Sequence, residues 1–428
     1  MTDGAPTGQG SAVRGVGGGA ERGPIGVAVL GSTGSIGRSV VDVLARHADR
    51  FRVVVLAAGR RVEHLAEQAR RLRPAVVAAE VPISPADLPP ATRAVRVDRT
   101  GLAELVALPE VELVVVGTSG LVALRATMAA LEAGKVVATS NKETLVAAGH
   151  LVMPLARRLA AVVAARDPAA PMASPLAWLR PIDSEHSAIW QCLVGEAPGT
   201  IRRLLLTASG GPFLDAPLAD LAAVRPADAL RHPTWRMGPK ITVDSATLVN
   251  KGLEVIEAHW LYDVGYEAID VVIHPQSIVH SLVEFVDGSL KAQLGRPDMR
   301  HPIQYALSFP SRLPGPVEAL DLASLGRLDF RAPDPARFPA LATAYRAGRL
   351  GPRATAALIA ADEVAVERFL SGALPFPGIA RLIEAAVDRF GEGPAPATVE
   401  AVEALTAEVR ATFGDGGGRP APAIEVRG

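Results

Sequence analysis

Short apolar runs alternate with amphipathic segments through the first 180 residues of the chain. Strands are expected over 25–30, 51–56, 75–79, 111–116 and 136–139, with helices near 38–48, 62–72 and 121–133 between them. Strands that alternate with helices form a parallel sheet whose crossovers are right-handed. This alternation predicts a Rossmann-type domain over residues 25–180.

The pattern changes from about residue 181. Polar residues and histidines cluster over 181–309, where we expect a helix over 245–262 and a hairpin that turns at Asp287 and Gly288. Many prolines predict a linker over 310–339, and helical periodicity predicts a small helical bundle over 340–413. The expected architecture is α/β, with a Rossmann-type domain, a central α+β domain, a C-terminal helical domain, and tails at 1–24 and 414–428.

A glycine-rich turn links the first predicted strand to the first predicted helix. Its glycines let the backbone approach a pyrophosphate bound at the start of the helix, and they are Gly31, Gly34 and Gly37. Hydroxyl groups between them can add donors, and these belong to Ser32, Thr33 and Ser35. The turn predicts dinucleotide binding; the alternative is a tight strand–helix turn with no ligand.

Two arginines follow the second predicted strand. An acidic residue at this place would accept the ribose hydroxyls of NAD, whereas Arg60 and Arg61 suit the 2′-phosphate of NADP. The alternative is a solvated basic pair at the start of a helix. We therefore expect the Rossmann-type domain to bind NADP.

Asp183 and Glu185 place two carboxylates on one side of an extended or turning segment. Hard divalent cations such as Mg²⁺ and Mn²⁺ prefer oxygen ligands in such an arrangement, and Glu254 can supply a third carboxylate. The alternative is that Asp183 or Ser184 only caps the helix that follows.

A polar block around residue 250 predicts an anion site. If Ser245 begins a helix, its hydroxyl and the first backbone N–H groups can bind an anion, with further donors on Asn250 and Lys251. The alternative is that Lys251 and Glu254 form an ordinary ion pair on a solvated helix face.

Glycines and hydroxyls in 207–213, Ser209 among them, predict a phosphate loop, and a lid is expected over about 209–239. Trp235 in a segment bounded by glycine and proline suits a lid that excludes water, although a tryptophan can equally pack in a core. His280 is a candidate near the substrate, whereas His274 is expected to be structural.

Composition limits the classes of partner. A net charge of −1 provides no global field for nucleic acid or anionic membrane. The single cysteine, Cys192, excludes an internal disulfide and fits a reducing compartment. Residues 1–24 lack the apolar core of a signal peptide, and the apolar runs are short for a membrane span. We expect a cytoplasmic protein.

Taken in order, these blocks resemble a known enzyme family. The blocks 31–37, 140–146, 181–186, 207–213, 235–238, 243–257, 274–280 and 292–299 occur in this order in 1-deoxy-D-xylulose 5-phosphate reductoisomerases. The resemblance runs from about residue 25 to about residue 387. It implies a homodimer that rearranges and reduces 1-deoxy-D-xylulose 5-phosphate to 2-C-methyl-D-erythritol 4-phosphate with NADPH, in non-mevalonate isoprenoid biosynthesis. Metal-assisted retro-aldol and aldol steps would precede hydride transfer.

The resemblance also implies roles for individual residues. The ligands of Mg²⁺, Mn²⁺ or Co²⁺ would be Asp183, Glu185 and Glu254. Substrate would contact Ser184, Glu185, Ser209, His232, Trp235, Ser245, Asn250, Lys251 and Glu254, with Met237 also in the lid. The cofactor would contact Thr33, Gly34, Ser35, Ile36, Gly59, Arg60, Arg61, Asn141, Lys142, Glu143 and Gly238. Catalytic roles would fall to Lys142, Glu185 and His280.

Some questions stay open at this point. The general base is one of Lys142, Glu185 or a water on the metal. Two rivals are a semialdehyde dehydrogenase, which would need Cys192 as nucleophile, and a non-catalytic NADP-binding sensor. The chain departs from the family at Ala208, at Arg236 in the lid, and in a longer stretch over 154–180.

Overall fold

The computed structural model describes residues 23–235 and 237–414, and its N-terminal part is built on a seven-stranded sheet. In chain order the strands are β1 (Ile25–Leu30), β2 (Phe51–Ala58), β3 (Val76–Ala79), β4 (Arg93–Arg96), β5 (Leu113–Val116), β6 (Val136–Thr139) and β7 (Leu179–Pro181). Their order across the sheet is β4-β3-β2-β1-β5-β6-β7, and every neighbouring pair is parallel. The predicted tails fall almost wholly outside the described residues.

Helices connect these strands as the alternation predicted. They are α1 (Ser35–Arg46), α2 (Val62–Leu72), α3 (Arg99–Val106), α4 (Leu124–Glu132), α5 (Lys142–Ala164) and α6 (Pro175–Trp178). The sequence did not predict β4, β7, α3, α5 or α6. In edge strand β4, two half-buried apolar residues stand between two exposed arginines, so the strand lacks the continuous apolar run of an inner strand.

A second, four-stranded sheet lies in the central part of the chain. Its strands are β8 (Ile201–Ala208), β9 (Ile269–Ile273), β10 (Val279–Phe285) and β11 (Leu290–Leu294), in the order β11-β10-β8-β9. The antiparallel pair β10–β11 is the predicted hairpin. The helices of this part are α7 (Ser184–Leu193), α8 (Pro226–Ala229), α9 (Pro239–Thr247), α10 (Val249–Tyr262), α11 (Arg300–Ser308) and α12 (Leu322–Leu325). Short 3-10 helices span Pro85–Asp87, Gly120–Ala123, Pro171–Ala173, Leu218–Ala223 and Tyr266–Ala268.

The expected single helix over 245–262 is wrong. Helix α9 ends at Thr247, Leu248 has a left-handed backbone with φ of 55°, and α10 begins at Val249. The prediction failed because leucine rarely adopts this conformation, so no residue type marks the break. Ser245 therefore lies near the end of a helix and not at its start.

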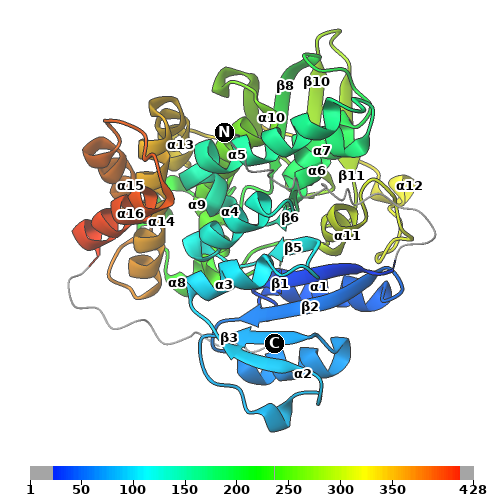
Figure 1. The fold of residues 1–428 in the computed structure, drawn as a ribbon. Coiled ribbons are helices and arrows are strands. Elements are labelled where there is room, and N and C mark those ends of the chain that lie inside the picture. The colour runs from blue at the N-terminus through cyan, green and yellow to red at the C-terminus, as the bar shows by residue number, and fades with distance from the viewer. Residues whose placement is uncertain (1–22, 236, 415–428) are drawn as a thin grey trace, which may run out of the picture.

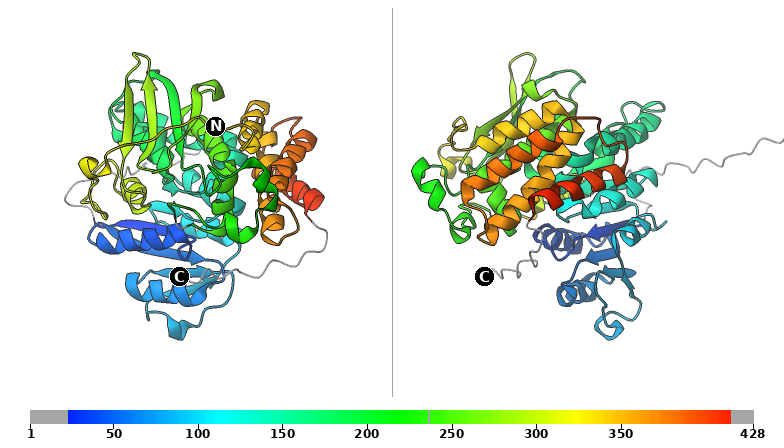
Figure 2. Two further views of the ribbon diagram at one scale, coloured as in Figure 1. Left: turned by 180° about the vertical axis from the view of Figure 1, so that it is seen from behind. Right: turned by 90° about the vertical axis from the view of Figure 1, so that its left-hand side faces the viewer.

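Four helices form the C-terminal domain, namely α13 (Pro339–Leu350), α14 (Pro352–Leu370), α15 (Phe376–Phe390) and α16 (Val399–Phe413). They lie on the opposite side of the molecule from the four-stranded sheet, with the seven-stranded sheet below both in the first view (Figures 1 and 2). Helix α14 packs against α5, and α13 packs against α10. The domain limits given by the sequence remain predictions.

Helix α5 occupies the centre of the packing. Among the described residues it alone is long and apolar enough to cross a membrane by length and composition, although the sequence suggested only short apolar runs. Half of its most apolar window is buried, and it packs against α10 and α14, as a core helix does. The chain's apolar core is continuous from the first strand to α16.

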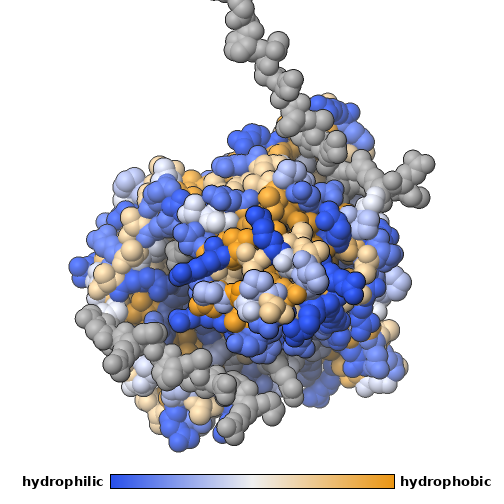
Figure 3. Space-filling view, turned by 60° about the horizontal axis from the view of Figure 1, so that its bottom comes forward, coloured by the Kyte–Doolittle hydropathy of each residue, from blue (hydrophilic) through white to orange (hydrophobic). Residues whose placement is uncertain are grey.

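The surface offers little guidance to a binding site. With the bottom of the first view turned forward, hydrophobic residues gather near the centre of the face and hydrophilic residues surround them (Figure 3). Exposed apolar area of this kind is ordinary for globular proteins, so the site must be found from its chemistry.

The contact between α5 and α10 depends on a glycine. A Cβ at Gly149 would lie 2.4 Å from the ring of Trp260. We predict that Gly149→Val lowers the free energy of unfolding by about 1–3 kcal/mol through overpacking. The matched control is Ala161→Val, at an exposed position of the same helix. Thermal unfolding midpoints measure both, and equal midpoints would contradict this account of the packing.

Candidate active site

Adjacent strands of the seven-stranded sheet deliver candidate residues to one edge. The glycine turn follows β1, Lys142 follows β6, and Asp183 follows β7. Because all strands are parallel, their carboxyl ends meet at the same edge, which is where open α/β sheets bind ligands. The fold therefore brings the predicted cofactor turn and the predicted metal motif to the same side.

A cavity of about 470 Å³ joins most of the predicted residues. Those that line it are Ser35, Ile36, Lys142, Asp183, Ser184, Glu185, Ser209, His232, Trp235, Met237, Ser245, Asn250, Lys251, Glu254 and His280. The predicted cofactor residues outside its lining are Thr33, Gly34, Gly59, Arg60, Arg61, Asn141, Glu143 and Gly238.

Three carboxylates and two ammonium groups form the centre of the cavity. Lys142 Nζ lies 2.6 Å from Asp183 Oδ2 and 3.1 Å from Glu254 Oε1. Lys251 Nζ lies 2.8 Å from Glu185 Oε1 and 2.5 Å from Glu254 Oε2. The carboxylates of Asp183, Glu185 and Glu254 each offer an oxygen within 4.8 Å of the others.

The charges of this cluster are unbalanced. Burial alone would lower the pKa of Lys142, but Asp183 and Glu254 raise it well above its usual value. Burial opposes ionisation of Glu185, yet Lys251 and the hydroxyl of Ser184 lower its pKa to about 2. Burial, and then Glu185, raise the pKa of Glu254, whose side chain is only 1 % exposed. Of the three carboxylates, Glu254 is therefore the one whose ionisation the surroundings oppose.

Hard oxygen ligands with an unneutralised charge fit a divalent cation. Carboxylates grouped in this way are the donors that Mg²⁺ and Mn²⁺ prefer. Asp183 occupies the N-cap position of α7, but its side chain makes no capping hydrogen bond. The capping alternative for Asp183 is therefore wrong, and its carboxylate is directed to Lys142 instead.

A second group of potential ligands lies behind the first. Asp183, His186 and Glu257 also bring ligand atoms within 4.8 Å of one another. His186 Nε2 lies 3.0 Å from Glu257 Oε2, and both side chains are fully buried. Neither His186 nor Glu257 lines the cavity, although Asp183, the third member of the group, does.

The opposite end of the cavity carries neutral donors. His232 Nε2 lies 3.1 Å from both Ser209 Oγ and Ser245 Oγ. Gly211 has a positive φ of 68°, and a Cβ there would lie 2.9 Å from Ser245 O. Only glycine allows this approach, which holds the predicted phosphate loop against α9.

His232 is held in one tautomer. Its Nδ1 accepts hydrogen bonds from the backbone N–H groups of Thr234 and Trp235, so in the neutral ring the proton is on Nε2. A proton on Nδ1 would point at the hydrogens of these two N–H groups, which is unfavourable. Burial lowers the pKa of His232 to about 4, and this geometry favours the same neutral form. The ring can therefore donate from Nε2 into the cavity.

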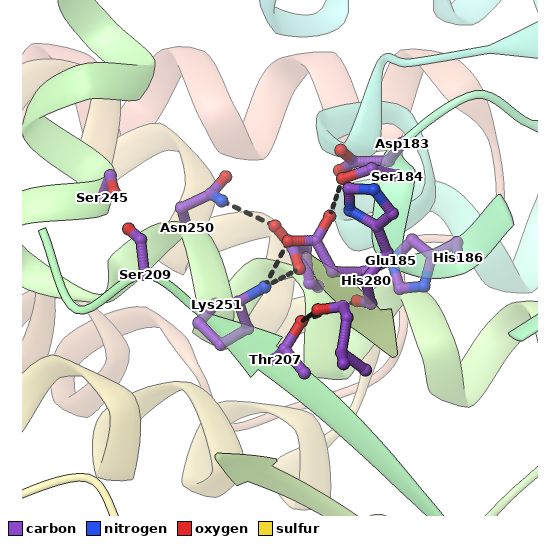
Figure 4. A network of polar contacts seen from close by, with 12 residues as sticks. Asp183, Ser184, Glu185, His186, Thr207, Ser209, Ser245, Asn250, Lys251 and His280 are labelled. Carbon is purple, nitrogen blue, oxygen red and sulfur yellow. Dashed lines mark hydrogen bonds and ion pairs between the residues drawn. The ribbon is translucent and has the colours of Figure 1, made fainter. Parts of the chain in front are cut away.

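The two ends of the site are spatially separate. Ser209 and Ser245 lie on one side, Asp183 and Ser184 on the other, and Lys251 lies between them (Figure 4). Asn250 Nδ2 donates to Glu254 Oε1 at 2.6 Å. Helix α10 places Asn250, Lys251 and Glu254 within its first turns, so these residues bridge the two ends. The alternative of a solvated Lys251–Glu254 pair is wrong because both side chains are buried.

The cofactor turn has the glycines that a close ligand requires. Gly31 has a φ of 80°, and a Cβ at Gly37 would lie 2.2 Å from Gly31 O. Arg60 and Arg61 are exposed beyond β2, and no ion pair involves either side chain within the described part of the chain. Their guanidinium groups are therefore available to an anion.

Two predicted cofactor residues have side chains engaged within the protein. Asn141 Nδ2 donates to the carbonyl oxygens of Thr118 and Gly120, and Asn141 Oδ1 caps α5 through Thr144 N. Glu143 Oε1 accepts from Gly120 N at 3.1 Å. Both side chains hold the loop that follows β5. They therefore lie beside that loop and not in the cavity.

The histidines and the cysteine have distinct environments. His274 is buried and contacts Asp329 O and Ile278 N, which is the structural role expected for it. His280 lines the cavity, and burial lowers its pKa. Burial raises the pKa of Cys192 to about 11, and the thiol lies outside the cavity lining, which excludes it as the nucleophile of a semialdehyde dehydrogenase.

Sequence reasoning missed three buried carboxylates near the site, namely Asp244, Glu257 and Asp362, and their half-buried neighbour Lys240. One signal was present. Asp362 is a carboxylate within the apolar run of α14, and a charge in such a run needs a buried partner.

Family comparisons agree along the chain. A family model described as 1-deoxy-D-xylulose 5-phosphate reductoisomerase matches residues 27–149. Two models for C-terminal domains of the same enzyme match residues 179–262 and 294–412.

Individual relatives agree with the family models. A 1-deoxy-D-xylulose 5-phosphate reductoisomerase of Pelotomaculum thermopropionicum is 48% identical over 383 residues, covering 88% of this chain and 95% of its own. One of Symbiobacterium thermophilum is 51% identical over 376 residues, covering 85% and 92%. The Zymomonas mobilis enzyme in complex with NADPH is 38% identical, with a TM-score of 0.79 over 90% of this chain and 97% of that one. A reductoisomerase solved with NADPH, fosmidomycin and magnesium is 37% identical, with a TM-score of 0.80 over 91% and 97%.

The environment of His232 predicts its titration. In phosphate-free protein, its ring should titrate at about 4, well below the ordinary value of 6.5. Between these values the unfolded chain binds more protons, so the stability contributed by neutral His232 is lost as pH falls from 6.5 towards 4. NMR of the ring, assigned with His232→Gln, measures the pKa. Inorganic phosphate should raise it; a ring that titrates near 6.5 without phosphate would contradict the geometry.

Proposed function

Because the chain belongs to the 1-deoxy-D-xylulose 5-phosphate reductoisomerase family, we propose that it catalyses the reaction of that family. It converts 1-deoxy-D-xylulose 5-phosphate to 2-C-methyl-D-erythritol 4-phosphate with NADPH and a divalent metal, in isoprenoid precursor biosynthesis. The observation that carries the proposal is the single cavity with donors for a phosphate at one end and three carboxylates at the other (Figure 4). A small sugar phosphate has a matching anion and chelating oxygens.

The carboxylate end is proposed to hold the metal. Asp183, Glu185 and Glu254 are the ligands, and Ser184 Oγ orients Glu185 through a hydrogen bond of 2.6 Å. When bound, a divalent cation supplies charge neutralisation and Lewis-acid polarisation of substrate oxygens. Lys142 and Lys251 neutralise the same carboxylates in the described structure, so the cation would free their ammonium groups for substrate.

The donor end is proposed to hold the phosphate. The hydroxyls of Ser209 and Ser245 and the Nε2–H of His232 converge there, with Asn250 and Lys251 beside them. These contacts are remote from the reacting carbons, so their binding energy can hold and orient the substrate throughout the reaction. A neutral His232 donates without adding charge.

We propose that the Lys142 ammonium donates a hydrogen bond to the reacting oxygens and stabilises negative charge on them. Its raised pKa keeps the ammonium protonated, and its Nζ lies among the predicted metal ligands. Glu185, with a pKa of about 2, is ionised and suited to metal binding. His280 is neutral near pH 7 because burial lowers its pKa, and it can orient substrate by hydrogen bonding.

The lid and the cofactor turn are proposed to complete the site. Trp235 and Met237 line the cavity, and the ring of Trp235 lies 6.4 Å from that of His280. Closure of these side chains would exclude water. Ser35 and Ile36, from the glycine turn, line the same cavity, so NADPH bound on the turn is beside the substrate.

We further propose a homodimer in the cytoplasm. Strand β11 is an edge strand, and exposed apolar side chains lie near it, with exposed fractions of 65% at Val286 and 56% at Leu290. An unpaired apolar edge favours association with another chain. The single buried cysteine supports a reducing compartment.

The direct test follows NADPH absorbance on addition of 1-deoxy-D-xylulose 5-phosphate with Mn²⁺ or Mg²⁺. We expect metal-dependent oxidation of NADPH that excess chelator stops. A folded protein that binds NADPH but never oxidises it would contradict the proposal and favour a binding-only role.

Cofactor choice gives a separate prediction. Replacing Arg60 and Arg61 together with alanine should raise the Michaelis constant for NADPH about tenfold and leave that for NADH nearly unchanged, because the guanidinium groups pair with the 2′-phosphate. Arg52→Ala, exposed on β2, is the control. Equal effects on both cofactors would exclude this role.

A further inference from the structure

A charged junction lies outside the cavity, where the end of the lid meets the C-terminal helices; its two carboxylates are buried, and the side chain of its lysine is 27% exposed. Lys240 lies in the first turn of α9, and its Nζ is 2.7 Å from Asp244 Oδ2 on the next turn. The same ammonium also contacts Asp362 Oδ2 on α14. Helices α9 and α14 pack against each other (Figure 1). We call Lys240, Asp244 and Asp362 the lid junction.

Separating the charged groups of this junction would be energetically unfavourable. The side chains of Asp244 and Asp362 are 2% and 0% exposed, and they share one ammonium. Their Oδ1 atoms have no hydrogen-bond partner among the described residues. Burial, and then Asp362, raise the pKa of Asp244 well above its usual value. Removing the shared cation would leave two buried carboxylates together, which is strongly unfavourable.

The junction is placed to control the phosphate end of the site. Lys240 directly follows the predicted lid over 209–239, and α9 also carries Ser245. Thr242 Oγ1 donates to Gly238 O at 2.8 Å, which fixes the last lid residues to the same helix. At its other end, α9 stops at the left-handed Leu248. The nine-residue helix α9 lies between the lid and α10, and it packs against α8 and α10 as well as α14.

The C-terminal helical domain contributes no residue to the cavity lining among the described residues. Its Asp362 nevertheless contacts the helix that carries Ser245. Burial lowers the pKa of Lys240, but Asp244 and Asp362 raise it above its usual value. Glu143, next to Lys142 in the chain, raises it further. The junction therefore links the lid, the C-terminal domain and the start of α5.

We propose that Lys240 and Asp362 are positioning residues: their ion pair fixes α9 against α14, and thereby sets Ser245 and the end of the lid for binding the substrate phosphate. The C-terminal helical domain acts on the site through this contact. The identity of the phosphorylated substrate rests on the proposed function. The role of the ion pair in anion binding does not.

Asp362→Leu is the decisive variant. It removes the ion pair to α14 and leaves Lys240 paired with Asp244, so the ammonium is not left without a counter-charge. Lys240→Gln is less suitable because it leaves both carboxylates together. Asp362→Asn provides a graded change. The matched control is Glu403→Gln, which breaks another ion pair between the C-terminal and cofactor domains, at 2.6 Å from Arg125 and away from the lid.

In Asp362→Leu, we expect the Michaelis constant for 1-deoxy-D-xylulose 5-phosphate to rise about tenfold. The affinity for inorganic phosphate, measured by calorimetry, should fall by a similar factor. Trypsin should cleave faster after the exposed Arg231 in the lid. The affinities for NADPH and Mn²⁺ should change less than about twofold. Asp362→Asn should show smaller changes in the same direction, and Glu403→Gln should show none.

A folded Asp362→Leu protein with an unchanged Michaelis constant, phosphate affinity and cleavage rate would overturn the proposal, even if its unfolding temperature were lower. Equal changes in Glu403→Gln would overturn it too, because they would indicate general loosening of the domain. If the wild-type protein does not turn over the sugar phosphate, the proposed function fails, whereas the phosphate and trypsin measurements still decide the role of the junction.

Discussion

The need to neutralise three carboxylates in one cavity, of which Glu254 is fully buried and Asp183 and Glu185 are largely buried, constrains the arrangement of the whole chain. Asp183 and Glu185 come from the start of α7, and Glu254 comes from α10. Lys142, at the start of α5, and Lys251 provide the opposing charge. Uncompensated charges at this depth would be strongly destabilising, so the three helix starts must converge. The same convergence creates a site that a divalent cation fits.

Different parts of the chain supply the residues at the two ends of the cavity. The parallel sheet brings the glycine turn and the metal motif to its carboxyl edge, and the four-stranded sheet and α9 bring Ser209 and Ser245 to the other end of the cavity. The helical domain contributes no side chain to the described lining, yet Asp362 ties it to α9. Packing, charge and anion recognition are therefore coupled through short helices at domain contacts.

Much of the fold and the site follows from local sequence signals. Inner strands such as β6 and amphipathic helices such as α2 have the periodicity that predicts them, and the motif residues from Asp183 to Glu254 meet in one cavity as expected. The break at Leu248 has no residue-type signal, because tertiary packing holds a leucine in a conformation it rarely adopts. Asp362, the partner of Lys240 on α14, lies 122 residues away along the chain, and no local pattern pairs the two.

The most direct test of this account is a titration with Mn²⁺ followed by electron paramagnetic resonance. We expect the wild-type protein to bind one Mn²⁺ per chain and Glu254→Gln to bind it about a hundredfold more weakly, because a ligand is lost. Glu257→Gln should retain most of the affinity, since Glu257 lies outside the cavity lining. Unchanged binding in Glu254→Gln together with lost binding in Glu257→Gln would contradict the account and place the metal beside His186.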